Sequence, residues 1–164
     1  MARALIVGCG CRGRELGKAL LGAGWQVRGT TRDPDRAEAI EARGIEAATA
    51  DPDRAATILD QVRDVTLIFW LLGSAVGEPD AVAAIHGPRL ERVLSEIVDT
   101  PVRGFVYEGA GSVEPRYGEG GAAIVGAAGE RWRIPVVVTG TSPADIDLWL
   151  EDMLAAAREL ISLA

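Results

Sequence analysis

The chain has 164 residues, 48% of them hydrophobic and 25% charged, which suits a single domain over residues 1–164 and is too short for a cofactor domain plus a full substrate domain. No apolar run approaches the roughly 20 residues that span a bilayer, and Met-Ala-Arg leads straight into apolar residues without room for a signal peptide, so we expect a cytoplasmic protein with no membrane partner. The formal net charge of −7 argues against a nucleic-acid partner, because phosphate backbones need a basic surface.

The first apolar run, residues 4–7, ends in a glycine-rich turn. Gly8, Gly10 and Gly13 are spaced G-x-G-x-x-G, and a segment with helical periodicity follows. Gly8 permits the tight turn, Gly10 lets the backbone approach a pyrophosphate, and Gly13 allows the helix to pack closely on the strand. The phosphates would be bound by free N–H groups at the positive end of that helix. We therefore predict a dinucleotide-binding turn in which Cys11 and Arg12 also contact the cofactor.

The rest of the chain alternates between short apolar runs and segments of helical period. Further strands are expected at residues 25–30, 45–49, 65–72, 102–107 and 134–138, and helices at residues 16–23, 33–44, 51–62, 90–98, 122–132 and 144–163. Residues 73–87 and 108–121 are rich in Gly and Pro and are expected to be loops. Six strands joined through helices require right-handed crossovers and a parallel sheet. We predict an α/β, doubly wound Rossmann fold with the strand order 3-2-1-4-5-6.

The second predicted strand ends where the ribose of an adenine nucleotide is bound in such folds. NAD sites place an acidic side chain there, whereas an Arg accommodates the 2′-phosphate of NADP. This chain has Thr30, Thr31 and Arg32, with Asp33 as the nearest acid, and Arg12 offers a second guanidinium. NADP(H) is therefore preferred, with NAD(H) as the alternative cofactor. At this point the two arginines can also be interpreted as solvated loop residues.

Together with the glycine turn, the sequence VRGTTRDP at residues 27–34, Asp51 after the third strand and FVY at residues 105–107 resemble the short-chain dehydrogenase/reductase superfamily. The likeness is to its extended and atypical branches, which include NAD(P)-binding, NAD-dependent epimerase/dehydratase-like proteins. The resemblance implies an oxidoreductase that uses a nicotinamide cofactor on an unknown small-molecule substrate. It also implies that Asp51 binds the adenine amino group and that the backbone at Gly73 and Ser74 runs beside the nicotinamide ribose.

The resemblance further implies two catalytic residues, Ser112 and Tyr117. Tyr117 stands where the family has the tyrosine of its Y-x-x-x-K motif, but the fourth residue after it is Gly121, and the only lysine of the chain is Lys18. In the family that lysine lowers the pKa of the tyrosine from about 10 so that the phenol can exchange a proton. Three hypotheses follow: an oxidoreductase, a non-catalytic nucleotide-sensing or regulatory binding module, and an epimerase or isomerase that uses bound cofactor.

Four other residues carry weaker signals. Cys9 and Cys11 cannot complete a metal site with a single histidine, so they are either small residues tolerated beside phosphate or include a thiol made reactive by the N–H groups of the turn. His86 is interpreted as a surface loop residue in preference to a catalytic base. Glu108 ends the fifth strand and is expected to point toward the crevice, as a desolvated base or a solvated acid.

Two helices present apolar sides, at residues 90–98 and at the C-terminal end. Each either packs on the sheet of its own chain or forms a homodimer surface. Because no substrate lobe follows the sixth strand, we expect a substrate pocket that is shallow or completed by a partner.

Overall fold

Six parallel strands form one sheet in the order β3-β2-β1-β4-β5-β6, in a computed structural model that describes residues 2–163. The strands are β1 (Arg3–Val7), β2 (Gln26–Thr31), β3 (Glu46–Thr49), β4 (Leu67–Trp70), β5 (Gly104–Glu108) and β6 (Val136–Thr139). The helices are α1 (Cys11–Gly22), α2 (Ala37–Glu41), α3 (Ala55–Leu59), α4 (Pro79–Ile85), α5 (Pro88–Glu96), α6 (Pro115–Trp132) and α7 (Ile146–Ser162), with 3-10 turns η1 (Pro34–Arg36) and η2 (Ile97–Asp99). The order and the parallel pairing confirm the predicted doubly wound fold.

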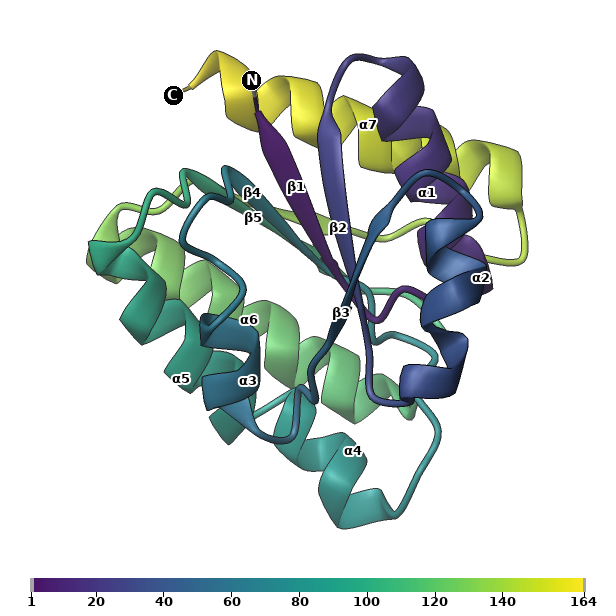
Figure 1. Cartoon of the computed structure of the whole chain (residues 1–164). Helices are drawn as coiled ribbons and strands as arrows, with labels where there is room; N and C mark the ends of the chain where they lie inside the picture. Colours follow the sequence, from purple (N-terminus) through teal and green to yellow (C-terminus); the bar gives the residue numbers. More distant parts are fainter. Residues whose placement is uncertain (1, 164) are drawn as a thin grey trace.

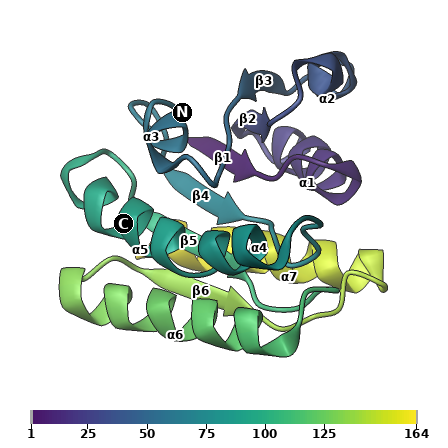
Figure 2. The same ribbon diagram turned by 90° about the horizontal axis from the view of Figure 1, so that it is seen from below.

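Helices cover both faces of the sheet, as Figure 2 shows along its edge. In β1, Leu5 and Val7 pack toward α3, α5 and α6, whereas Ala4 and Ile6 pack toward α1 and α7. Figure 1 shows α1 and α7 side by side on their face of the sheet, where they are in contact. Burial on both faces explains why β1 and β4 are continuous apolar runs rather than alternating ones.

The stretch 73–87, predicted as a loop, contains α4. Pro79 is its first residue, and Val82 and Ile85 are buried. The prediction was wrong because seven helical residues with two core contacts give too short a periodic signal between Gly77 and Gly87.

The stretch 108–121, also predicted as a loop, contains the first part of α6, which begins at Pro115 rather than at residue 122. Two of its helical glycines, Gly118 and Gly121, serve close packing instead of a turn. A Cβ on Gly121 would lie 2.0 Å from the hydroxyl oxygen of Tyr107, and a Cβ on Gly118 would lie 3.3 Å from the carbonyl oxygen of Gly109. The helix therefore approaches β5 and the loop after it more closely than side chains would permit.

The strand order reverses between β1 and β4, so the chain segments that leave these strands separate at the carboxyl edge of the sheet. In open α/β sheets such a point leaves a crevice. Among residues 2–163, no helix is long and apolar enough to cross a membrane.

Candidate functional site

The glycine turn joins β1 to α1 at the carboxyl edge of the sheet. Gly8 has a φ of +88°, and a Cβ there would lie 2.6 Å from the carbonyl oxygen of Leu71, so only glycine fits. A Cβ on Gly13 would lie 3.0 Å from the carbonyl oxygen of Gly8, whereas the space beside Gly10, the N-cap of α1, is open. The first N–H groups of α1 have no acceptors within the helix and lie beside this open space.

Thr30 of β2 holds the turn in place. Its side-chain oxygen accepts a hydrogen bond from the N–H of Gly8 at 3.2 Å, and its carbonyl oxygen accepts one from the N–H of Cys9 at 3.0 Å. Thr30 is buried. The turn is therefore held by two hydrogen bonds to β2.

A pocket of about 300 Å³ opens beside the turn, where the strand order reverses. Sequence reasoning named eleven cofactor residues, and all except one line this pocket. The lining members are Gly8, Gly10, Cys11, Arg12, Gly13, Thr30, Thr31, Arg32, Asp51 and Ser74. The exception is Gly73, whose N–H donates a hydrogen bond to the carboxylate of Glu108. Residues far apart in the chain thus meet at one cavity.

The end of the pocket beside β2 is basic. Arg32 and Arg36 both line it and both are exposed. Asp33, the acid nearest to the end of β2, does not line the pocket; its carboxylate accepts a hydrogen bond from the N–H of Asp35 at 3.0 Å and caps η1. Arg36 was missed by sequence reasoning, which expected a helix over residues 33–44 but did not indicate which of its side chains faces the pocket.

Two acids of this half have partners within the protein. Asp51 accepts a hydrogen bond from the N–H of Asp53 at 2.9 Å, and its own N–H donates to Thr57 at 2.8 Å. Asp53 forms an ion pair with Arg89, with 3.2 Å between carboxylate oxygen and Nε. The ion pair with Arg89 offsets the charge of Asp53 beside the two pocket arginines.

The other half of the pocket contains a buried carboxylate. Glu108, the last residue of β5, is 1% exposed and lines the pocket together with Trp149 of α7. Its Oε1 accepts a hydrogen bond from the N–H of Gly73 at 2.9 Å, and its Oε2 accepts one from Nε1 of Trp149 at 2.8 Å. Burial raises the pKa of Glu108, while these two hydrogen bonds and the charge of Arg12 oppose the shift. Of its two predicted roles, desolvated base and solvated acid, the second is wrong.

His86 lies in the core beneath the pocket, so its interpretation as a surface loop residue was wrong. It is 2% exposed. Its Nδ1 lies 2.5 Å from the hydroxyl oxygen of Tyr107, and its Nε2 lies 2.8 Å from the carbonyl oxygen of Leu72. Because a carbonyl only accepts, Nε2 carries the proton and Nδ1 accepts from the phenol. Burial lowers the pKa of His86 and raises that of Tyr107, so both groups are neutral.

Comparison with known proteins supports the fold. No family model and no curated protein sequence matches the chain, but solved structures do. A short-chain dehydrogenase/reductase superfamily protein from Agrobacterium tumefaciens, solved with bound NAD, has a TM-score of 0.68 and 20% identity, over 83% of this chain and 48% of that one. UDP-glucuronic acid 4-epimerase from Bacillus cereus, solved in complex with NAD, has a TM-score of 0.64 and 13% identity, over 83% of this chain and 54% of that one. Vestitone reductase from alfalfa has a TM-score of 0.61 and 16% identity, over 84% of this chain and 56% of that one.

The chain has the doubly wound Rossmann fold that these solved structures contain. The resemblance inferred from the glycine turn and from residues 27–34 is confirmed at the level of the fold. The chain spans about half the length of the solved structures that it matches.

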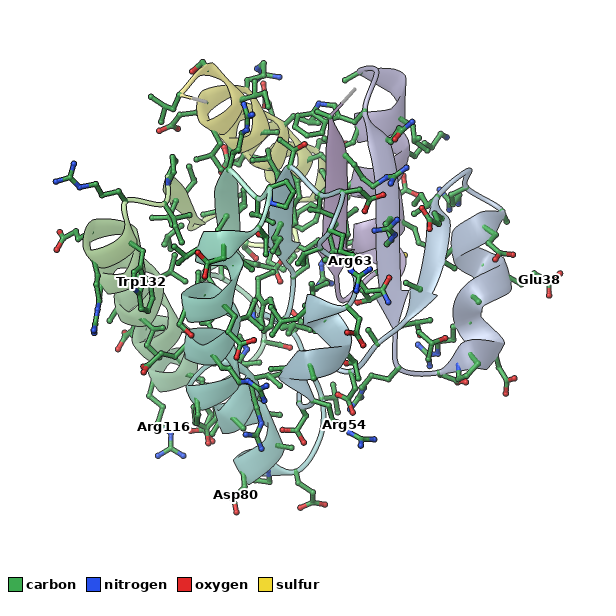
Figure 3. The ribbon with its side chains drawn as sticks, turned by 60° about the vertical axis from the view of Figure 1, so that its left-hand side comes forward. Glu38, Arg54, Arg63, Asp80, Arg116 and Trp132 are labelled. Atoms are coloured by element: carbon green, nitrogen blue, oxygen red, sulfur yellow. The ribbon has the colours of Figure 1, made fainter. Side chains whose placement is uncertain are left out.

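The two residues that the sequence resemblance implies as catalytic lie outside the pocket lining. Ser112 is exposed in the loop after β5. Tyr117, in the first turn of α6, accepts a hydrogen bond from Nη2 of Arg116 at 3.0 Å, and that guanidinium lies over its ring at 4.9 Å from the ring centre. Figure 3 shows Arg116 projecting away from the body of the protein. Gly121, where the sequence resemblance would place a lysine, faces Tyr107 instead of the pocket.

The cysteines of the turn have different surroundings. Cys9 is buried against Gly29, where a Cβ would lie 2.5 Å from its sulfur, and burial raises the pKa of its thiol to about 12. The interpretation of Cys9 as a thiol made reactive by the N–H groups of the turn is therefore wrong. Cys11 is exposed, is the first residue of α1 and lines the pocket. Residues 2–163 contain no group of His, Cys, Asp or Glu side chains arranged to hold a metal ion.

Proposed function

We propose that this chain binds NADP(H) in the pocket beside the glycine turn and is an oxidoreductase of the short-chain dehydrogenase type. The observation that carries the proposal is that the turn and Arg32, predicted independently from two motifs, line the same pocket. The nicotinamide dinucleotides bound in two of the similar structures support the class of ligand.

The residues of the pocket fit a dinucleotide phosphate. The open space beside Gly10 lies at the start of α1, where free N–H groups and the helix dipole bind pyrophosphate. Arg32 and Arg36 would bind the 2′-phosphate, because guanidinium groups bind phosphate in a bidentate manner. NAD(H) lacks this phosphate and would bind more weakly. When bound, the cofactor supplies hydride transfer; the residues above hold and orient it.

Titration of the purified protein with NADPH and NADH tests the proposal. We expect NADPH to bind at least about tenfold more tightly than NADH, since one charge-assisted contact to phosphate contributes about 1.5–3 kcal/mol. Substitution of Arg32 and Arg36 together by alanine should remove this preference and leave NADH binding unchanged. Arg54→Ala, an exposed arginine outside the pocket lining, is the matched control. Absence of binding to both cofactors at millimolar concentration would refute the proposal.

A non-catalytic binding module is the second candidate, and the surroundings of Tyr117 and Gly121 favour it. The phenol of Tyr117 is bound to exposed Arg116, and Gly121 has no room for any side chain. The lysine that the resemblance implies four residues after the tyrosine therefore has no counterpart at Gly121.

Turnover assays distinguish the candidates. Hydride transfer to a panel of carbonyl compounds that is abolished in Tyr117→Phe would establish the oxidoreductase. Tight cofactor binding without turnover, with affinity changed less than about twofold in Tyr117→Phe, would establish the binding module. Conversion of sugar nucleotides at constant cofactor redox state would establish the third candidate, an epimerase, for which the likeness to UDP-glucuronic acid 4-epimerase is the motivation.

A further inference from the structure

Glu108 is a buried carboxylate without a cationic partner. Both groups that donate hydrogen bonds to it, the N–H of Gly73 and Nε1 of Trp149, are neutral. Within the described residues 2–163, no Arg or Lys lies at ion-pair distance from it; the guanidinium of Arg12 acts only as a more distant charge. A buried carboxylate in this condition is costly to ionise unless a positive charge comes close.

The two donors fix the carboxylate but do not use all of its capacity. Each oxygen accepts one hydrogen bond, and an ionised carboxylate has about four acceptor positions. Glu108 also lines the pocket, so it contributes to the electrostatic potential of the cavity. A positive group bound in this half of the pocket would meet the carboxylate in a site largely removed from water, where charge interactions are strong.

The bound dinucleotide would bring such a group to this half. Folds of this type have two mononucleotide-binding halves on either side of the point where the strand order reverses. Arg32 marks the adenosine half beside β2, so the nicotinamide nucleotide belongs to the half that follows β4 and β5. There Glu108 and Trp149 line the pocket with the apolar side chains of Leu72 and Ile85. The oxidised nicotinamide ring carries a positive charge, and the reduced ring carries none.

We propose that Glu108 is the counter-ion of the oxidised nicotinamide ring, and that the site consequently binds NADP⁺ more tightly than NADPH. This inference rests on the proposed function and specifies which redox form of the cofactor the same pocket selects. Gly73 and Trp149 act as positioning groups, because their hydrogen bonds hold the carboxylate at the pocket wall.

The proposal has a pH dependence whose sign follows from the surroundings of Glu108. The groups that face it are the backbone of Gly73 after β4, Trp149 of α7, the cation Arg12 of α1 and the neutral phenol of Tyr107 in its own strand. Burial raises the pKa of Glu108, so lowering the pH protonates it before ordinary carboxylates. Binding of the cationic ring favours the ionised form. The affinity for NADP⁺ therefore increases relative to that for NADPH as the pH rises through the pKa of Glu108.

Calorimetric titration with NADP⁺, NADPH and 2′-phospho-ADP-ribose, which lacks the nicotinamide ring, tests the proposal. Glu108→Gln removes the charge and retains the shape, and Glu119→Gln removes the same charge from an exposed position of α6 outside the pocket lining. We expect Glu108→Gln to shift the ratio of the NADP⁺ and NADPH affinities toward NADPH by about tenfold. The ring-free nucleotide should bind the wild type and both variants equally, and Glu119→Gln should leave all affinities unchanged.

The outcomes separate the two proposals. If none of the three ligands binds, the proposed function itself is refuted. If the ligands bind and Glu108→Gln leaves the ratio within about twofold, Glu108 is only a bridge between Gly73 and Trp149 and the counter-ion proposal is overturned. If that variant does not fold, the wild type decides: a ratio that rises with pH for NADP⁺ over NADPH supports the proposal, and a ratio that stays constant from about pH 5 to 9 overturns it.

Discussion

Gly121→Ala tests whether the position of the family lysine is closed by the core. The added Cβ would lie 2.0 Å from the hydroxyl oxygen of Tyr107 and 2.4 Å from its Cζ. Tyr107 cannot move aside easily, because it is fully buried and its hydroxyl donates to Nδ1 of His86 at 2.5 Å. Overpacking of a core costs about 1–3 kcal/mol, and a rigid ring places this clash at about 3 kcal/mol. Alanine returns about 1 kcal/mol through its helix propensity, which leaves a net destabilisation of about 2 kcal/mol.

Gly120→Ala is the matched control on the same helix, since no atom lies within 4 Å of a Cβ at that position. It should stabilise the protein by about 0.5–1 kcal/mol. Urea unfolding followed by circular dichroism measures the free energy of unfolding of both variants. In thermal unfolding, the midpoint of Gly121→Ala should lie about 6 °C below that of the wild type. If Gly121→Ala is as stable as Gly120→Ala, α6 can move away from β5. The steric reason for the missing lysine would then be refuted.

Two further predictions concern stability and thiol chemistry. Arg28→Met should lower the free energy of unfolding by about 2 kcal/mol, because Arg28 is nearly buried and binds both oxygens of Asp64, at 2.7 and 3.2 Å. Substitution of the exposed Arg63 by methionine should lower it by less than about 0.5 kcal/mol, and equal losses in the two variants would contradict the role of the ion pair. Iodoacetamide should label the exposed Cys11 and spare the buried Cys9 in the folded protein, and mass spectrometry of the digested protein measures the labelling of each. Labelling of Cys9 at the same rate as Cys11 would contradict the burial and the raised pKa of its thiol.

The fold and the half of the pocket beside β2 were predictable because their signals are local. Gly8, Gly10 and Gly13 lie within six residues of chain, and the strand order follows from the alternation of strands and helices. Arg32 directly follows β2, so its place at the pocket depends only on where that strand ends. For these residues, position in the sequence determines position in the site.

The half of the pocket beside β4 and β5 was not predictable in the same way, because its contacts join distant segments. Glu108 binds Gly73 and Trp149, which lie 35 and 41 residues away in the sequence. His86 meets Tyr107 across 21 residues, and no local pattern distinguishes this buried histidine from an exposed one. The glycines of α6 misled the prediction for a related reason: a glycine needed for close packing has the same letter as a glycine needed for a turn.

The charges around the pocket are complementary to those of the ligand proposed for it. Arg12, Arg32 and Arg36 line the part of the pocket proposed to bind the pyrophosphate and the 2′-phosphate, and Glu108 lies at the wall of the other half. An oxidised dinucleotide phosphate has the complementary pattern, with anionic phosphates in one half and a cationic ring in the other. The reduced form retains only the anionic part of that pattern and would leave Glu108 either protonated or unpaired. Since a buried ionised carboxylate without a cation is costly, the counter-ion proposal expects the oxidised cofactor to be favoured wherever Glu108 is ionised.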